Sequence, residues 1–188
     1  MKINGKFILF TVILVAITTL CKFFFGPQLS WSGFSPVIAI ALFSGFIIRK
    51  KDYSFLLPLL ALLLSDAIIQ VLYNLGEFPY AGFYQGQWKN YLILMLSTLM
   101  GWSLKGKDYG RLAIGAMAAP TVFFLVSNFN VWLNNEVVYA KSFSGLMSCY
   151  AAGLPFYKNA LIATVVFLPV ILFAYNRLTQ HKNELVLA

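Results

Sequence analysis

The sequence predicts an all-α integral membrane protein, a single domain of six transmembrane helices over residues 1–188. Hydrophobic residues make up 60% of the chain and charged residues 11%, whereas soluble domains average roughly 45–50% apolar and about 25% charged residues. The chain also divides at its charges and turn residues into apolar stretches close to the roughly 20 residues that cross a bilayer core of about 30 Å. Lipid is therefore expected to cover much of the folded surface.

The six predicted spans follow one another along the chain and are separated by polar connections. The first span is expected to remain uncleaved. The hydrophobic run after Lys2 and Lys6 lacks the small residues that a signal-peptidase site would need before Cys21. The later spans are bounded by charges or turn residues. The approximate bounds are 7–25, 34–48, 55–75, 88–104, 111–132 and 159–177.

Residues 142–156 form a further half-apolar stretch before the last span. The stretch is too short to cross the bilayer. Its content of Gly, Ser and Pro favours a short re-entrant or interfacial segment, with a helix broken at Gly153 and Pro155.

Lysine and arginine concentrate in alternate connections, which predicts that both chain ends lie inside (N-in/C-in). Short loops rich in these residues stay on the cytoplasmic side of a membrane. The pattern therefore indicates a multi-pass membrane protein, which in a bacterium would lie in the inner (cytoplasmic) membrane. It also assigns most of the net charge of +8 to orientation rather than to a nucleic-acid partner. The inner cations are Lys2, Lys6, Arg49, Lys50, Lys51, Lys105, Lys107, Arg111, Arg177 and Lys182.

Several classes of chemistry lack the residues that they require. The chain has one histidine, His181, beyond the last span, which argues against Ser-His hydrolases and intramembrane zinc proteases. It has no Walker lysine motif, Gly-rich dinucleotide fingerprint or C-x-x-C pair. We therefore expect neither an enzyme nor a bound cofactor, and any energy for transport would come from a partner.

Asp66 is the one acidic residue well inside a predicted span, in the outer half of the third. A carboxylate there is costly, so it marks a binding site, an ion path or a charged partner, for which Lys22 is the candidate. A purely structural pair fits the sequence equally well. Gln70 lies one helical turn further out on the same face and favours a polar cavity.

Further polar and aromatic side chains gather towards the outer side. Asn128 and Trp132 share a face near the end of the fifth span, and Asn159 opens the sixth, where its amide would bind a ligand or cap the helix. Interfacial belts account for many such aromatic residues, but the excess on one side also fits a ligand pocket. The expected aromatic walls of that pocket are Tyr84, Trp88 and Tyr150.

Two other features leave alternatives open. Cys21 and Cys149 both lie towards the outer side, where they would form a disulfide, pack separately or, for Cys149, bind a metal. Small residues four apart, Ala41 with Gly45 and Gly115 with Ala119, allow close helix packing within the bundle or against another membrane subunit. The second use would suit a non-catalytic accessory or assembly subunit of a membrane complex.

Four motifs in order resemble an uncharacterised bacterial family of small multi-pass membrane proteins. The resemblance covers about residues 15–175 and places Lys22 where a basic residue, commonly Arg, is expected. The family has no assigned activity. The motifs are FSPVIAIALFSG at 34–45, PLLALLLSD at 58–66, SNFNVW at 127–132 and CYAAGLPFYKN at 149–159.

More distantly, the predicted architecture resembles the substrate-binding S-component of energy-coupling-factor vitamin transporters, and the solitary cobalamin S-component is the nearest comparison. The resemblance implies a vitamin- or cofactor-like ligand in an outer pocket and a partner ATPase module. We therefore expect a substrate-binding or transport subunit in contact with the lipid bilayer. The predicted ligand-binding residues are Lys22, Asp66, Gln70, Tyr84, Trp88, Asn128, Trp132, Tyr150 and Asn159.

Overall fold

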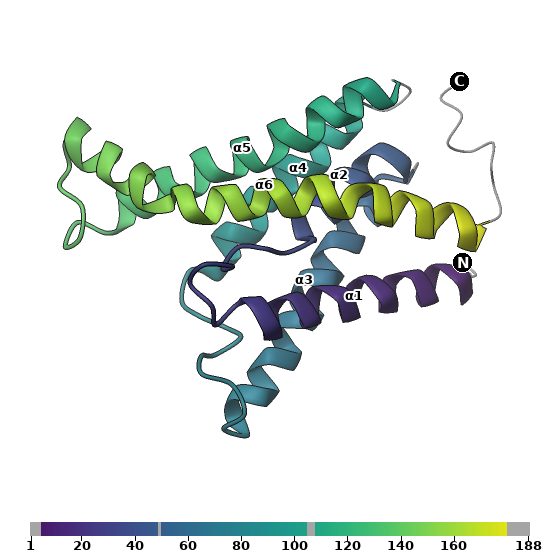
Figure 1. Ribbon diagram of the computed structural model, residues 1–188, viewed down its shortest axis with the longest axis horizontal. Helices are drawn as coiled ribbons and strands as arrows, with labels where there is room; N and C mark the ends of the chain where they lie inside the picture. The colour runs from purple at the N-terminus through teal and green to yellow at the C-terminus, as the bar shows by residue number, and fades with distance from the viewer. Residues whose placement is uncertain (1–4, 49, 105–107, 180–188) are drawn as a thin grey trace.

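The computed structural model describes residues 5–48, 50–104 and 108–179, and these residues form helices and turns without a strand. Figure 1 shows the six helices, which confirm the predicted all-α class. Their bounds are Gly5–Phe25 for α1, Val37–Ile47 for α2, Lys51–Asn74 for α3, Gln87–Leu104 for α4, Tyr109–Asn134 for α5 and Phe143–Thr179 for α6.

Four of these helices, α1, α3, α5 and α6, are long and apolar enough to cross a membrane. The other two fall short of this, although the bounds of α4 agree with the predicted span over 88–104. Helix α4 has 18 residues and carries Lys89 and Asn90 in its first turns. Helix α2 has only 11 residues and is about 16 Å long at 1.5 Å per residue. The expected second span over 34–48 is therefore a half-length helix that cannot cross a bilayer alone.

The start of α1 and the end of α6 lie at the same end of the bundle (Figure 1). We call this the inner end, following the orientation predicted from the charges, and the opposite end the outer end. A shared end is what the N-in/C-in prediction requires of the helices. Five of the ten predicted inner cations and His181 lie outside the described residues. These five cations are Lys2, Arg49, Lys105, Lys107 and Lys182.

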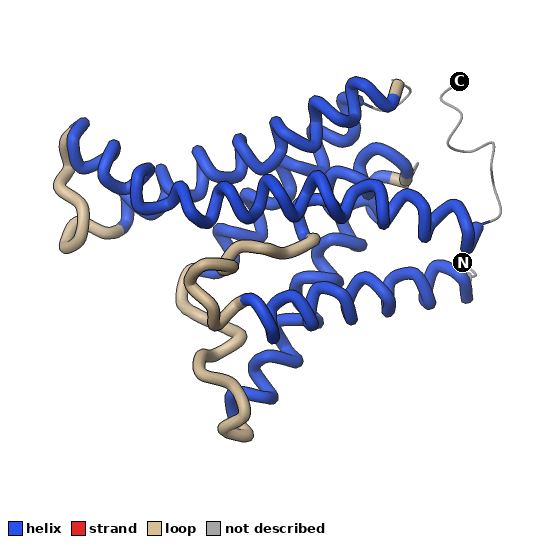
Figure 2. Tube along the Cα trace, viewed as in Figure 1, coloured by secondary structure: helices blue, strands red, loops and turns tan. Residues whose placement is uncertain are grey.

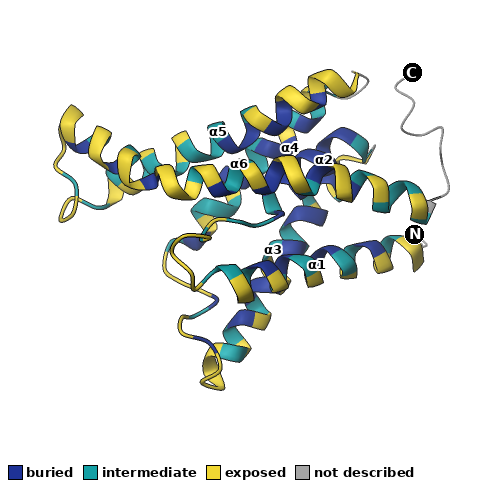
Figure 3. Ribbon diagram, viewed as in Figure 1, coloured by how far each residue is buried: buried dark blue, intermediate teal, exposed yellow. Residues whose placement is uncertain are grey.

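Helix α2 forms the centre of the hydrophobic core. Its sequence VIAIALFSGFI is apolar on every side, and its residues from Ile38 to Phe46 are all buried (Figure 3). A helix that is apolar all round must be surrounded by other elements, and α2 packs against α3, α4, α5 and α6. The long helices instead carry exposed apolar side chains on the faces that point away from the core.

Close contact between α2 and α4 depends on two glycines. A Cβ atom at Gly45 would lie 2.0 Å from the carbonyl oxygen of Thr98, and one at Gly101 would lie 2.3 Å from that of Leu42. The predicted small-residue face of α2 is therefore used inside the bundle. Gly115 and Ala119 are buried as well, so the second face is also covered by the chain's own helices.

Helix α6 corrects the expectation of a break before the last span. It runs without interruption for 37 residues through both Gly153 and Pro155. At Gly153 the helix lies close against α5, because a Cβ there would be 2.5 Å from Asn128 Oδ1. This packing stabilises the turn and overrides the weak helix propensity of Gly and Pro. At about 55 Å, α6 exceeds the bilayer thickness. Figure 1 shows it extending with α5 past the other helices at the outer end.

The connection between α1 and α2, residues 26–36, turns back into the bundle along α6 (Figure 2). The Asn159 amide of α6 donates hydrogen bonds to the carbonyl oxygens of Ser30 and Ser32, each at 2.9 Å. Further along α6, the Phe34 ring lies 5.6 Å from the Phe167 ring. Helix α2 therefore begins inside the bundle, beside α6, and not at the outer end of the bundle.

Candidate functional site

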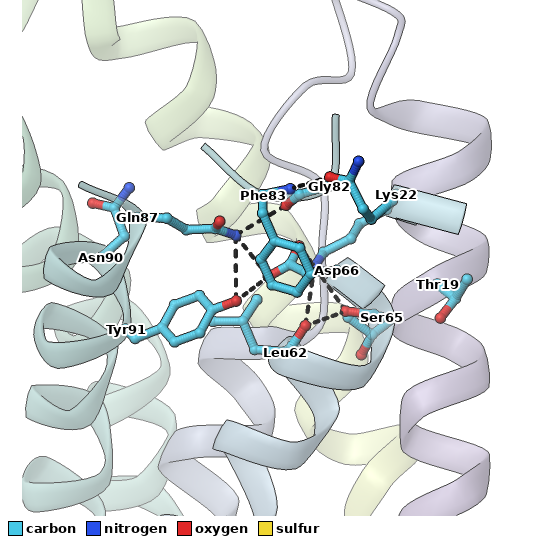
Figure 4. Close-up of polar contacts among 12 residues, drawn as sticks. Thr19, Lys22, Leu62, Ser65, Asp66, Gly82, Phe83, Gln87, Asn90 and Tyr91 are labelled. Carbon is cyan, nitrogen blue, oxygen red and sulfur yellow. Dashed lines mark hydrogen bonds and ion pairs between the residues drawn. The ribbon is translucent and has the colours of Figure 1, made fainter. Parts of the chain in front are cut away.

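A buried polar cluster joins α1, α3 and α4 in the outer half of the bundle (Figure 4). Lys22 of α1 places its Nζ 2.5 Å from Asp66 Oδ1 and 2.7 Å from Ser65 Oγ, both on α3. The same ammonium lies 3.5 Å from the Leu62 carbonyl oxygen. The sequence suggested Lys22 as a partner for Asp66, and the structure brings the two together.

Helix α4 supplies two further donors to the other carboxylate oxygen. Asp66 Oδ2 accepts hydrogen bonds from Gln87 Nε2 at 2.8 Å and from the Tyr91 hydroxyl at 2.5 Å. The Gln87 amide is itself held by the Gly82 carbonyl oxygen at 3.2 Å and by the backbone N–H of Tyr84 at 3.2 Å. The connection between α3 and α4 thus fixes the orientation of the amide that reaches Asp66.

The cluster satisfies a charge that would otherwise be costly at this depth. The Asp66 side chain is 8% exposed and the Lys22 side chain 19%. An unpaired carboxylate in such a place is strongly unfavourable, whereas one cation and two neutral donors offset its desolvation. The described contacts therefore give Asp66 a stabilising role that links three helices.

Sequence reasoning missed Ser65, Gln87 and Tyr91. One signal was present, because Gln87 and Tyr91 are four residues apart and so share a face of α4. Their amide and hydroxyl are 3.3 Å apart in the structure. Nothing in the local sequence indicates that this face turns towards Asp66, since that depends on how α4 packs against α3.

Replacing Tyr91 with Phe is expected to lower the free energy of unfolding by about 1.5–3 kcal/mol, because a buried hydrogen bond to a charged group is lost. Thermal or denaturant unfolding of the purified chain in one detergent would measure the change. Tyr84→Phe is the matched control, since Tyr84 is more than half exposed and its hydroxyl accepts a hydrogen bond from the neutral Asn90 amide. Equal losses in the two variants would contradict the assigned role.

A cavity of about 260 Å³ lies beside the cluster. We call it the outer cavity. Its walls come from α1, the 26–36 connection, the start of α2, and the helices α3, α5 and α6, and most of them are apolar. The lining residues are Lys22, Gly33, Ser35, Val37, Ile38, Leu62, Pro120, Phe123, Phe124, Ser127, Asn128, Phe156, Tyr157 and Ala160.

Two of the predicted ligand-binding residues, Lys22 and Asn128, line the outer cavity. Asp66 does not line it, but binds Lys22 directly behind the wall. The cavity therefore adjoins the cluster through Lys22 and through Leu62, whose carbonyl oxygen lies 3.5 Å from the Lys22 ammonium. Asn128 uses its Nδ2 to bond the Phe124 carbonyl oxygen of its own helix at 3.0 Å.

The remaining predicted polar residues hold connections and neighbouring helices in place. Gln70 accepts from the Phe83 N–H at 3.0 Å, and the Trp132 indole donates to the Ala140 carbonyl oxygen at 2.9 Å. Asn159 lies within α6 rather than at its start and anchors residues 26–36. None of the three lines the outer cavity.

The three aromatic residues predicted to wall a pocket, Tyr84, Trp88 and Tyr150, do not line the outer cavity. Tyr84 and Trp88 are more than half exposed, and the Tyr150 hydroxyl donates to the Leu125 carbonyl oxygen at 3.0 Å. The aromatic residues that do line the cavity belong to α5 and α6, where the Phe124 and Tyr157 rings stack with their centroids 4.8 Å apart. These aromatic lining residues are Phe123, Phe124, Phe156 and Tyr157.

The two cysteines are buried and separate, and neither forms a disulfide. The Cys149 thiol donates to the Asn128 carbonyl oxygen at 3.3 Å. Among residues 5–48, 50–104 and 108–179, no group of three or more His, Cys, Asp or Glu side chains gathers around Cys149 or elsewhere.

Comparison with protein families matches residues 1–185 to a family of unknown function, DUF6580. The chain belongs to this family. The match covers both the cluster and the outer cavity, so these features lie within the DUF6580 domain. No curated protein and no solved structure matches this DUF6580 chain.

Proposed function

We propose that this chain is a membrane subunit that captures a small molecule in the outer cavity. The observation that carries the proposal is the cavity itself, since protein interiors are close-packed and contain few voids larger than a water molecule. A volume of about 260 Å³ approaches the lower limit of known small-molecule sites, which are mostly apolar with a few placed polar groups. The lining of the outer cavity has this composition.

The walls of the outer cavity are held by specific contacts, which also suits binding. Asn159 fixes the 26–36 connection against α6, and Lys22 is fixed by Asp66 and Ser65. A site whose walls are already positioned loses less conformational entropy when a ligand binds. The polar cluster therefore contributes to binding as a support for one wall.

The proposal includes the finer features expected of an S-component-like protein. The chain would lie in a bacterial inner membrane, take its ligand from the outer side and depend on a partner ATPase module for transport. It would have no catalytic activity of its own. The alternative, an accessory or assembly subunit, would use exposed helix faces, and the two small-residue faces are buried.

Filling the outer cavity should abolish ligand retention. Ala160 lines the cavity from α6, so Ala160→Phe places a ring in the ligand's space. Mass spectrometry of small molecules extracted from the full chain, purified in mild detergent, would measure retention. We expect a retained molecule with the unmodified chain and its loss from the variant.

The matched control is Ala151→Phe, which makes the same substitution on the same helix at an exposed position. This variant should retain the molecule. Equal retention by the unmodified chain and both variants would contradict the proposal. It would also be contradicted if none of the three retained a molecule while all three unfolded at the same temperature.

A further inference from the structure

Helix α2 begins at the wall of the outer cavity. Pro36 already has helical backbone angles, φ −75° and ψ −3°. The first hydrogen bond of the helix runs from the Ile40 N–H to the Pro36 carbonyl oxygen at 2.8 Å. The first N–H groups of a helix have no partner within the helix, and no side chain caps this end. Val37 and Ile38, in the first turn, line the cavity.

A second observation concerns Ser35, which immediately precedes this helix. Its Oγ is buried and has no hydrogen-bond partner among the described residues, and Ser35 lines the same cavity. Buried hydroxyl groups are nearly always hydrogen-bonded, so an unpartnered one beside a cavity indicates a missing acceptor or donor. The hydroxyl therefore offers a free donor next to the start of α2.

The charges around the cavity favour an acidic group. Lys22 lines it, and no Asp or Glu is among the lining residues. Asp66 keeps two donors, Gln87 and Tyr91, that do not involve Lys22. The Lys22 ammonium can therefore interact with a second anion while the Asp66 carboxylate keeps two hydrogen-bond donors. The positive end of the α2 dipole adds to this field.

We propose that the outer cavity binds the carboxylate or phosphate of an amphipathic small molecule, with the acidic group at the start of α2 and beside Ser35 and Lys22. The inference rests on the proposed function and names the ligand class. Phe123, Phe124 and Phe156 would enclose the apolar body of the ligand. Both a soluble aryl or branched acid and a lipid-derived acid have this chemistry.

Calorimetric titration of the full chain in mild detergent tests the ligand class with matched probes. The probes are 3-phenylpropionate, phenyl phosphate and octanoate, each acid compared with a neutral analogue: 3-phenylpropionamide, benzyl alcohol and octanamide. We expect at least one acid to bind about tenfold or more tightly than its neutral analogue. Octanoate preference would indicate a lipid-derived ligand, and preference for the aryl acids a soluble one.

Ser35→Ala should weaken binding of the preferred acid by about tenfold, the effect of one hydrogen bond to a charged group, and leave the neutral analogue unaffected. Ser30→Ala, on the same connection but exposed and outside the cavity, is the control. Neutral probes that bind as well as every acid would overturn this inference and leave the proposed function standing. If neither acids nor neutral probes bind and Ala160→Phe changes nothing, both are wrong.

Discussion

Replacing Asp66 with Asn, or Lys22 with Met, is expected to lower the free energy of unfolding by about 3–5 kcal/mol. Each single change leaves the other charge buried without its counter-ion, and breaking a buried pair in this way is costly. Both replacements keep nearly the original side-chain volume, so the loss reports the charge rather than a cavity. Denaturant titration in a fixed detergent would measure it.

The double variant Lys22→Met with Asp66→Asn provides the control. It removes both charges together, and a neutral pair at a buried site is often as stable as the ion pair it replaces. We expect most of the loss in either single variant to be recovered, which would give a large coupling energy in the double-mutant cycle. Small and additive losses would show that the pair adds little to the stability of the bundle.

Replacing Gly45 with Ala should destabilise the chain by at least about 1–3 kcal/mol, the usual cost of overpacking a core. The added methyl group would meet the Thr98 carbonyl oxygen at 2.0 Å, so α2 and α4 would have to move apart. Gly101→Ala should have a similar effect, since its Cβ would meet the Leu42 carbonyl oxygen of α2. Unfolding temperatures in one detergent would compare the variants.

Gly115→Ala is the matched control for this close contact. Its position is also buried, but the nearest atom to an added Cβ is the Cδ1 of Leu104, which a side-chain rotation can move. The better helix propensity of Ala, about 1 kcal/mol over Gly, would offset the remaining cost. A loss at Gly115 as large as that at Gly45 would contradict the explanation from backbone contact.

The sequence predicted most of the helical architecture because long apolar stretches have few alternatives in a membrane. It did not predict the length of α2. Residues 34–48 have the composition of a span. Only tertiary contacts show that the helix starts late: Asn159 of α6 binds the 26–36 connection, and Phe34 of that connection packs against Phe167 of α6. The continuous α6 was missed for a similar reason, since α5 stabilises the turn around Gly153.

The candidate site was predictable in part. A buried acid needs a partner, which led to Lys22. The lining of the outer cavity brings together residues more than a hundred positions apart, such as Ser35 and Ala160, and no local pattern encodes that meeting. Outward-facing rings such as Trp88 suggested walls, but composition does not distinguish an exposed ring from one that faces a neighbouring helix.

The short length of α2 has a consequence for how the chain is made. A segment of 11 helical residues is too short to enter the lipid from the translocon as an independent span. Its neighbours α3, α4, α5 and α6 all follow it in the sequence, so its final surroundings do not exist when it emerges from the ribosome. Helix α2 can therefore reach its final packing only after the later helices have been synthesised.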